Sequence, residues 1–235
     1  MTLYYDKQKL ARGGSEDWSA VAFRGSAHTV VFDPSMDNAR PVSTARWLND
    51  FYELRDIQGM QYLHTDEVTD MQGMFTGCAE LLAIDLSAFN TEKVRDMNAM
   101  FMNCYKLQTI DVNSFDVSRV ADMTRMFASC KNLTTIYCKN NWFATANAGS
   151  VNMFYNCQKL VGGNGTVFDA SHVELDYARP DVPGQPGYFT GETGAQEGII
   201  TPSGSPSRGE KVLRNGMLLI NRNGKTYNAQ GAEAK

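Results

Sequence analysis

The hydrophobic positions in the middle of the chain recur every 26 residues without a gap. The recurrence covers three segments, residues 68–90, 94–116 and 120–138. Aligned apolar positions are Val68, Val94 and Val120; Met71, Met97 and Met123; Phe75, Phe101 and Phe127; Cys78, Cys104 and Cys130; Leu81, Leu107 and Leu133; and Ile84, Ile110 and Ile136. A self-match of this density predicts stacked structural repeats, in which each unit buries its apolar side against its neighbours.

Two hydrophobic periodicities lie within each repeat. In the first repeat, apolar residues from Val68 to Cys78 are spaced by three or four, which predicts a short helix with one apolar face. The segment from Leu81 to Leu86 then alternates apolar and polar positions, which predicts a strand. Stacked units of this kind form a parallel sheet on one side, short helices on the other and a shared core between them. The sequence therefore predicts an α/β repeat fold.

The repeats extend in both directions and make five units, residues 47–160. Downstream, Phe154 and Cys157 continue the pattern after a spacing of 27, and upstream Phe51 takes the place of the cysteine. Because the outer units of a stacked array need covering, we expect residues 1–46 to form an N-terminal cap and residues 161–190 a C-terminal cap.

Both caps contain strand patterns. Residues 27–33 alternate and predict an edge strand parallel to the first repeat strand, and residues 167–169 predict a last strand. Residues 162–165, which are rich in glycine, predict a turn. Three prolines between residues 180 and 186 exclude regular structure there, so we expect Tyr188 and Phe189 to pack back onto the core.

The composition changes after the C-terminal cap. Residues 191–209 are dominated by Gly, Ser, Pro and Thr and predict a flexible linker. In residues 210–235, two Asn-Gly pairs separate alternating apolar runs, and Asn-Gly is the preferred turn of a two-residue hairpin. We therefore predict a small β tail with strands at residues 211–214, 217–222 and 225–228.

The repeat VTDMxxMFxxCxxLxxIDLSxFNT resembles the BspA-like leucine-rich repeat of bacterial surface proteins, and its period lies in the leucine-rich-repeat range. Flanking segments such as LYYDKQKL and PGYFT agree, so the resemblance covers residues ~1–190. It implies a right-handed solenoid and a setting on the surface of Bacteroidetes cells. The tail KVLRNGMLLINRNGKTYNAQGAE resembles the C-terminal tails of secreted Bacteroidetes proteins, which implies export and surface anchoring.

Charge and hydropathy exclude two classes of function. The formal net charge is −4, with acidic and basic residues interspersed, so the basic patch of a nucleic-acid-binding protein is missing. No stretch approaches the ~18 apolar residues of a transmembrane helix. No signal peptide opens the chain, so the surface hypothesis implies that the natural signal was removed and that Met1 begins a mature fragment.

Four of the five cysteines, Cys78, Cys104, Cys130 and Cys157, hold the same repeat position. Neighbours in this column are expected about 5 Å apart, which permits a disulfide by distance, but parallel Cβ vectors give it a poor dihedral angle. We expect buried free thiols instead, with Cys138 in a core position of a strand. A zinc site needs convergent, usually paired ligands, so we predict neither a metal nor a cofactor.

The positions between the strand anchors are expected to face solvent, and repeat proteins commonly bind through this surface. We predict Asp85, Asp111 and Tyr137 as ligand-binding residues, with Gln108 and Thr135 beside them. Two adjacent carboxylates also suit a calcium site or a general acid/base pair. The sequence favours a simpler alternative, in which aspartate only keeps the sheet soluble, because like charges side by side cost stability without a cation.

Trp142 departs from the repeat pattern and has two interpretations. It packs under the last predicted helix, or it is exposed beside Tyr137 and stacks on a sugar or contacts a protein.

The sequence favours binding over catalysis. The three histidines, His28, His64 and His172, fall in different loops and caps, and no catalytic signature accompanies them, so we do not expect an enzyme. We expect a surface-displayed or secreted adhesin, and the resemblance implies host matrix proteins, epithelial cells or other bacteria as partners. The alternatives are glycan capture, with Tyr137 and Trp142 as a stacking platform, and a structural surface spacer.

Overall fold

A computed structural model describes residues 1–3, 25–145 and 148–191, together with the backbone of three strands between residues 210 and 228. The chain divides into two compact units, Met1–Gly194 and Ala195–Lys235, which we describe separately. Residues 4–24 of the predicted N-terminal cap and residues 192–209 of the predicted linker lie outside the described residues.

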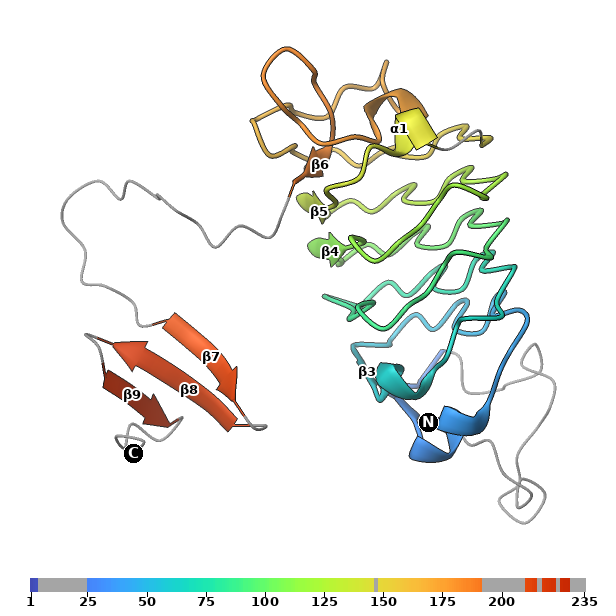
Figure 1. The fold of residues 1–235 in the computed structure, drawn as a ribbon, viewed down its shortest axis with the longest axis vertical. Coiled ribbons are helices and arrows are strands. Elements are labelled where there is room, and N and C mark those ends of the chain that lie inside the picture. The colour runs from blue at the N-terminus through green and yellow to red at the C-terminus, as the bar shows by residue number, and fades with distance from the viewer. Residues whose placement is uncertain (4–24, 146–147, 192–209, 215–216, 223–224, 229–235) are drawn as a thin grey trace. The chain divides into compact units, whose positions relative to one another are not determined.

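The first unit is built from layers of chain, and successive repeats lie one on another (Figure 1). Backbone hydrogen bonds join equivalent parts of neighbouring repeats: Phe75 N donates to Met100 O (2.9 Å), and Phe101 N donates to Met126 O (2.8 Å). A column of single parallel bridges also crosses the layers, through Ser43, Asp70, Asp96, Asp122 and Gly149. The repeat in the sequence is therefore a repeat in the structure.

Short parallel strands form one side of the layers. The strands β4 (Thr109–Asp111), β5 (Thr135–Tyr137) and β6 (Phe189–Thr190) pair in this order. Ile110 is opposite Ile136, which is opposite Phe189, and these three side chains are buried. The prediction of a last strand at residues 167–169 is wrong. Val167 makes a single antiparallel bridge to Val161, and the edge beside β5 is taken by β6, because Phe189 supplies the apolar side chain that covers Ile136.

The N-terminal end carries a second parallel sheet, with β1 (Thr2–Leu3), β2 (Thr29–Phe32) and β3 (Asp56–Gln58) in this order. The predicted strand at residues 27–33 is confirmed as β2, and it runs parallel to β3. Its expected place at the edge is wrong, because β1 pairs with its other side. The Val30 and Phe32 side chains of β2 are completely buried in the core. Two short 3₁₀ helices, η2 (Pro34–Asn38) and η3 (Met60–Tyr62), connect this sheet to the repeats.

The short helices expected in every repeat are not present among the described residues of the repeats. Residues 72–77 form successive turns, as do the equivalent residues of the following repeats. The helices of the described first unit are short: α1 (Trp142–Thr145) and the 3₁₀ helices η2, η3 and η4 (Leu175–Tyr177). No helix in the described part of the chain is both long and apolar enough to span a membrane.

Left-handed backbone conformations explain why these segments are not helical. Two residues per repeat, four positions apart, have positive φ, which an α-helix of L-residues does not tolerate. The first column is Arg46, Gly73, Ala99, Arg125 and Asn152, with φ of 59°, 58°, 52°, 57° and 59°. The second column is Asp50, Gly77, Asn103, Ser129 and Asn156, with φ of 62°, 75°, 63°, 61° and 62°. The backbone N–H groups therefore bond to the next repeat, as Gly73 N does to Asn98 O (2.8 Å).

Columns of stacked aromatic side chains fill the core between the turns and the strands. Phe75, Phe101, Phe127 and Phe154 stack with ring centroids 5.5, 5.6 and 5.8 Å apart and nearly parallel planes. A second column stacks Phe89 on Phe115 and Phe115 on Trp142, at 6.5 and 6.4 Å. Offset stacking of aromatic rings adds to the free energy of burying their area, so these columns tie the layers together.

The expected column of free thiols is confirmed. All five cysteines are buried and unpaired by disulfides. In the repeat column, each thiol donates to a backbone carbonyl of the preceding unit, as Cys104 Sγ does to Phe75 O (3.2 Å) and Cys130 Sγ to Phe101 O (3.1 Å). Burial raises the pKa of Cys130 and Cys157 far above the usual range, and that of Cys138 to about 12. The cysteines therefore act as small core groups.

The C-terminal cap is held by one buried carboxylate. Asp181 accepts hydrogen bonds from Asn164 N (2.8 Å), Thr166 N (2.9 Å) and the Thr166 hydroxyl (2.7 Å). Burial opposes the charge on Asp181, but these hydrogen bonds outweigh it and lower the pKa of Asp181. They also fix the turn that was predicted at residues 162–165 and is found at residues 163 and 164. As expected, Tyr188 and Phe189 are fully buried against the last repeat.

The second unit contains one antiparallel sheet. Its strands are β7 (Glu210–Arg214), β8 (Met217–Arg222) and β9 (Lys225–Asn228), within one residue of the predicted bounds. Arg214 is opposite Met217 and Arg222 is opposite Lys225, so each connection has two residues, as the Asn-Gly pairs predict.

Candidate functional site

Exposed side chains form a surface along β4 and β5, which we call the sheet face. One column of it crosses four layers, because Gln108 N bonds to Leu82 O (3.3 Å), Thr134 N to Gln108 O (2.9 Å) and Val161 N to Thr134 O (3.0 Å). Leu82 is 51% exposed and Val161 is 38% exposed, so the column has apolar side chains at its ends and polar ones between them. The sheet face consists of Leu82, Gln108, Thr134 and Val161, together with Thr109, Asp111, Thr135 and Tyr137.

Strand pairing sets the second part of the sheet face. Thr109 is opposite Thr135, and Asp111 is opposite Tyr137. Since side chains at such paired positions point to the same side of a sheet, three predicted residues, Asp111, Thr135 and Tyr137, lie on one surface. Gln108 directly precedes β4 and belongs to the adjoining exposed column. Gln108 and Asp111 are exposed, whereas Thr135 and Tyr137 are half-buried.

The two predicted carboxylates are engaged by their own turns. Asp85 accepts a hydrogen bond from Ser87 N (3.0 Å), and Asp111 accepts one from Asn113 N (2.9 Å). Hydrogen bonds from the Ser87 side chain and backbone lower the pKa of Asp85. Asp85 lies outside the strands, so the register that sets Asp111 beside Tyr137 does not extend to it. These bonds give both aspartates a local structural role, as Asx turns do elsewhere in proteins.

Trp142 packs in the core, as the first of its two interpretations predicted, and its side chain is not available to a ligand. Its side chain is completely buried, between the Phe115 ring (6.4 Å, stacked) and the Phe189 ring (5.0 Å, edge-on). A sugar-stacking platform needs an exposed ring face, so the predicted pair of Tyr137 and Trp142 does not form. The cause is β6, which follows Trp142 by more than forty residues in the sequence and closes over it.

Sequence reasoning missed a groove on the turn side of the layers, with a volume of about 240 Å³. Its floor is made by the small residues Gly73 and Ala99, and Arg46 and Arg125 stand at its ends in the same left-handed column. Amide side chains of Asn49, Gln72 and Asn98 line its sides. The recurrence of two small residues between two arginines was visible in the sequence, but the segment was interpreted as a helix.

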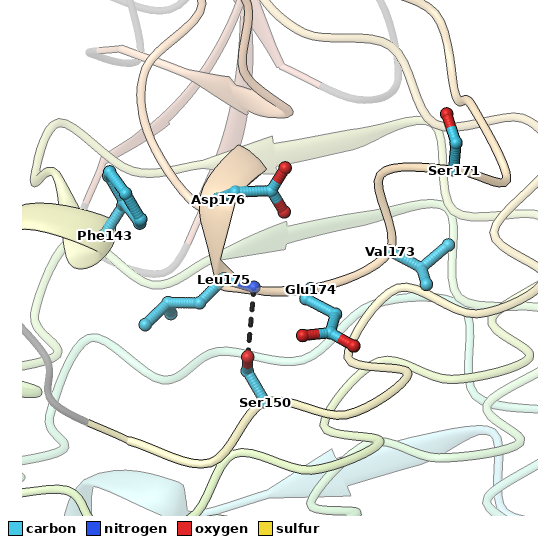
Figure 2. A pocket seen from close by; sticks show the side chains of 7 residues that line it. All are labelled: Phe143, Ser150, Ser171, Val173, Glu174, Leu175 and Asp176. Atoms are coloured by element: carbon cyan, nitrogen blue, oxygen red, sulfur yellow. Dashed lines mark hydrogen bonds between the residues drawn. The ribbon is translucent and has the colours of Figure 1, made fainter.

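The larger cavity, of about 400 Å³, lies in the C-terminal cap (Figure 2). Its lining comes from α1, from the end of the repeats and from the segment that leads into η4. These residues are Phe143, Ser150, Ser171, Val173, Glu174, Leu175 and Asp176. Ser150 fixes the two parts to each other, because Leu175 N donates to its hydroxyl oxygen (3.2 Å).

The cap brings a serine, a histidine and an aspartate together but does not arrange them for nucleophilic catalysis. His172 Nδ1 pairs with Asp176 (2.8 Å), and the imidazole stacks on Tyr177 at 4.2 Å. The nearest hydroxyl in sequence, that of Ser171, donates to Asp169 (2.7 Å) and not to the imidazole. An activated nucleophile requires a hydrogen bond to its base, and this one is committed elsewhere.

The described residues were also compared with the requirements of a metal site. The described ranges contain no group of three or more His, Cys, Asp or Glu side chains placed to hold a metal ion. What the surface offers is a long, shallow sheet face, a polar groove and one amphipathic cavity, all of which suit binding.

The comparisons with known proteins identify the repeats at the level of a family. Residues 47–165, just over half of the 235 residues, match the family described as "Mycoplasma protein of unknown function, DUF285". No curated protein and no solved structure matches the chain. The matched range contains the sheet face and all of the polar groove except Arg46, and it ends before the segment that leads into η4. By its repeats, this chain belongs to the DUF285 family, the Mycoplasma proteins of unknown function.

Proposed function

We propose that this chain is a protein-binding module of a bacterial cell surface and that it binds its partner through the sheet face. The observation that carries the proposal is the alignment of exposed side chains across four hydrogen-bonded layers, from Leu82 through Gln108 and Thr134 to Val161. A flat surface with aliphatic ends, a half-buried tyrosine and few charges has the character of the core of a protein interface.

The biological setting is part of the same proposal. The repeat resembles the BspA-like leucine-rich repeat, and short parallel strands stacked on a shared core are compatible with the right-handed solenoid of that family. The resemblance of the C-terminal tail supports secretion and surface anchoring in Bacteroidetes. Host matrix proteins, epithelial cells and other bacteria are the partners that we propose for such an adhesin. We propose no catalytic role for it.

The experiment is a binding array that carries matrix proteins, mucin glycans and dietary polysaccharides, probed with the full chain at physiological salt. We expect saturable binding to a protein. The double variant Gln108→Arg and Thr134→Arg places two bulky cations in the centre of the sheet face. Because central interface positions carry most of the binding free energy, we expect a loss of affinity of about 30-fold or more. Both side chains are exposed, so the fold should survive.

The matched control is the double variant Glu92→Arg and Ser118→Arg, which changes two exposed positions in the turns between repeats. It should bind like the unaltered chain. Equal affinity of both double variants would place the binding site elsewhere. Saturable binding to a glycan alone would favour glycan capture over adhesion. The absence of binding to every component of the array would favour a surface spacer.

A second pair of double variants measures how much the predicted carboxylates contribute to binding affinity. We expect Asp85→Asn with Asp111→Asn to weaken binding by less than the arginine pair, because both carboxylates already accept hydrogen bonds from their own turns. Asp116→Asn with Asp169→Asn is the control, since these aspartates also accept the N–H group two residues ahead. A loss of affinity for the first pair that matches the arginine variant would assign the carboxylates a direct contact.

A further inference from the structure

The polar groove on the turn side of the layers has an arginine at each end. Arg46 and Arg125 both line it, and both side chains are exposed. Among the described residues, neither guanidinium makes a hydrogen bond or an ion pair. Cations elsewhere on the repeats differ, because Arg55, Lys93 and Lys106 each face a glutamate, at 3.8, 2.7 and 2.7 Å. The two arginines of the groove are therefore open to an anion from outside the chain.

The stacking of the repeats sets the distance between these arginines. Arg46, Gly73, Ala99 and Arg125 stand in one column in four successive layers, which backbone hydrogen bonds of 2.8, 2.8 and 2.9 Å join. Layers that bridge like parallel strands are about 4.8 Å apart, so the Cα atoms of the two arginines lie about 14 Å from each other. The floor between them carries no side chain larger than a methyl group, which leaves the groove open along its length.

Gly73 lets the first arginine enter the groove. A Cβ atom built at Gly73 would lie 3.6 Å from Arg46 Cγ and 3.8 Å from Asn49 Oδ1. The aliphatic stem of Arg46 therefore leans over the glycine, into the space that lies between the two arginines.

Amide side chains on the walls suit a peptide backbone. Gln72 makes no side-chain hydrogen bond among the described residues, so its amide keeps donors and an acceptor for a ligand. Asn49 and Asn98 each donate one N–H to an aspartate, Asp50 (2.6 Å) and Asp122 (3.2 Å), and keep their carbonyl oxygens as acceptors. Peptide groups need both kinds of partner, and this wall supplies both.

The carboxylates next to the groove are engaged by their own backbone. Asp70, Asp96 and Asp122 accept the N–H group two residues ahead, at 2.9, 2.8 and 2.7 Å, and none of them lines the groove. Their charge reduces the attraction of an anion at long range. It does not occupy the hydrogen-bond donors of the two guanidiniums, which stay free for a ligand.

We propose that the polar groove binds an extended acidic segment of a partner protein, with one carboxylate at each arginine. Residues i and i+4 of an extended chain point to the same side and are about 13 Å apart, which matches the separation of Arg46 and Arg125. A guanidinium forms two parallel hydrogen bonds with a carboxylate. The peptide groups between the two acidic residues pass over Gly73 and Ala99 and bond to the amides of the walls.

This site is independent of the proposed function of the sheet face, because the two surfaces share no residue. A partner that wraps around the layers would use both of them. Either site can fail its test without affecting the other.

The test uses the full chain, labelled with ¹⁵N, and two peptides that differ in charge. The acidic probe is acetyl-Glu-Gly-Ser-Gly-Glu-amide, and acetyl-Gln-Gly-Ser-Gly-Gln-amide is its neutral counterpart. We expect the acidic peptide to shift the amide signals of Gly73 and Ala99 in a saturable manner. An exposed charge pair contributes a factor of about five to affinity, so the neutral peptide should bind about 25-fold more weakly.

The variants Arg46→Gln and Arg125→Gln should each reduce the affinity for the acidic peptide about fivefold, and the double variant about 25-fold. Binding of the neutral peptide should not change. Arg119→Gln, at an exposed arginine outside the groove, is the matched control and should bind like the unaltered chain. The ¹⁵N spectrum of each variant reports whether it is folded.

Four outcomes would overturn the proposal. They are equal binding of the two peptides, an unchanged affinity in the double variant, an equal loss of affinity in Arg119→Gln, and the absence of saturable shifts. Tighter binding of trigalacturonic acid than of the acidic peptide would also overturn it, since the groove would then take an acidic glycan.

Discussion

At the scale of single residues, the same side chain acts differently according to what surrounds its repeat position. Asp96 and Asp116 are both aspartates that accept the N–H group two residues ahead, at 2.8 Å in each case. Asp96 lies in the bridged column between Asp70 and Asp122, where burial first and these two like charges next raise its pKa. Asp116 is exposed, and hydrogen bonds from Ser118 lower its pKa.

We predict that Asp96→Asn raises the stability of the chain at neutral pH. A pKa that is raised by folding means that the folded state binds more protons than the unfolded state, so this group's contribution to stability decreases as pH rises through the raised pKa. An asparagine still accepts the hydrogen bond of Asn98 N but removes the repulsion, which is worth about 0.5 kcal/mol. Urea denaturation at pH 7 should show the gain, and at a pH below both pKa values it should vanish.

Asp116→Asn is the control with the opposite sign. Its lowered pKa stabilises the folded state above the unfolded pKa, and this stabilisation is lost as pH falls through the folded pKa. We therefore expect this variant to be neutral or less stable at pH 7. A decrease in stability for Asp96→Asn as large as that for Asp116→Asn would refute the assignment of repulsion to the column.

At the scale of elements, the turn segments are the part of the repeat that a helix would otherwise occupy. Their apolar residues recur every three or four positions, as in a helix, because two turns with a left-handed residue in each also return to the core at that spacing. The difference lies in the backbone hydrogen bonds, which run between layers in the turns. Stability of this element therefore depends on residues that tolerate positive φ.

We predict that Ala99→Gly stabilises the chain. Ala99 has φ of 52°, where a Cβ atom costs about 1 kcal/mol or more, and its equivalent in the preceding repeat is Gly73. Part of the gain is lost to the greater freedom of glycine in the unfolded chain, so the net increase should be about 0.5 kcal/mol. Thermal or urea unfolding measures it.

Ala128→Gly is the matched control in the following repeat. Ala128 is 4% exposed and is absent from the residues with positive φ, so the same exchange should destabilise by about 1 kcal/mol. If both exchanges destabilise the chain equally, the positive φ of Ala99 does not lower the stability of the folded state.

At the scale of the whole molecule, the columns make the repeats depend on one another. Each thiol of the repeat column bonds to the preceding unit, and each phenylalanine of the main column stacks on the next. A single unit cannot bury its apolar side alone, so its stability comes from its interfaces. The family match covers this array, and the candidate binding surfaces lie on it and on its C-terminal cap.

We predict that the five cysteines become reactive together. All are buried and free in the folded chain, so a thiol reagent should modify none of them under native conditions. In increasing urea, pulsed labelling followed by mass spectrometry should yield two populations, one with no label and one with five. Chains labelled at Cys157 or Cys78 alone would demonstrate fraying of the terminal repeats and would contradict cooperative unfolding.

The sequence by itself determined the repeats, their core columns and the strands of the tail, because these follow from local spacing. Periodic apolar residues identify which positions face inward, and Asn-Gly pairs set two-residue connections between β7, β8 and β9. The same logic placed Asp111, Thr135 and Tyr137 on one surface and the cysteines in the core.

Only the tertiary structure decided the features that depend on contacts between distant segments. Helix and successive turns share one hydrophobic spacing, so the choice between them was made by left-handed residues whose N–H groups bond to the next repeat. The burial of Trp142 depended on β6, and the cap cavity depended on η4 reaching Ser150. The spacing of apolar residues along the chain identifies which side chains face the core. Whether the other side chains stay exposed depends on whether a segment distant in the sequence packs over them.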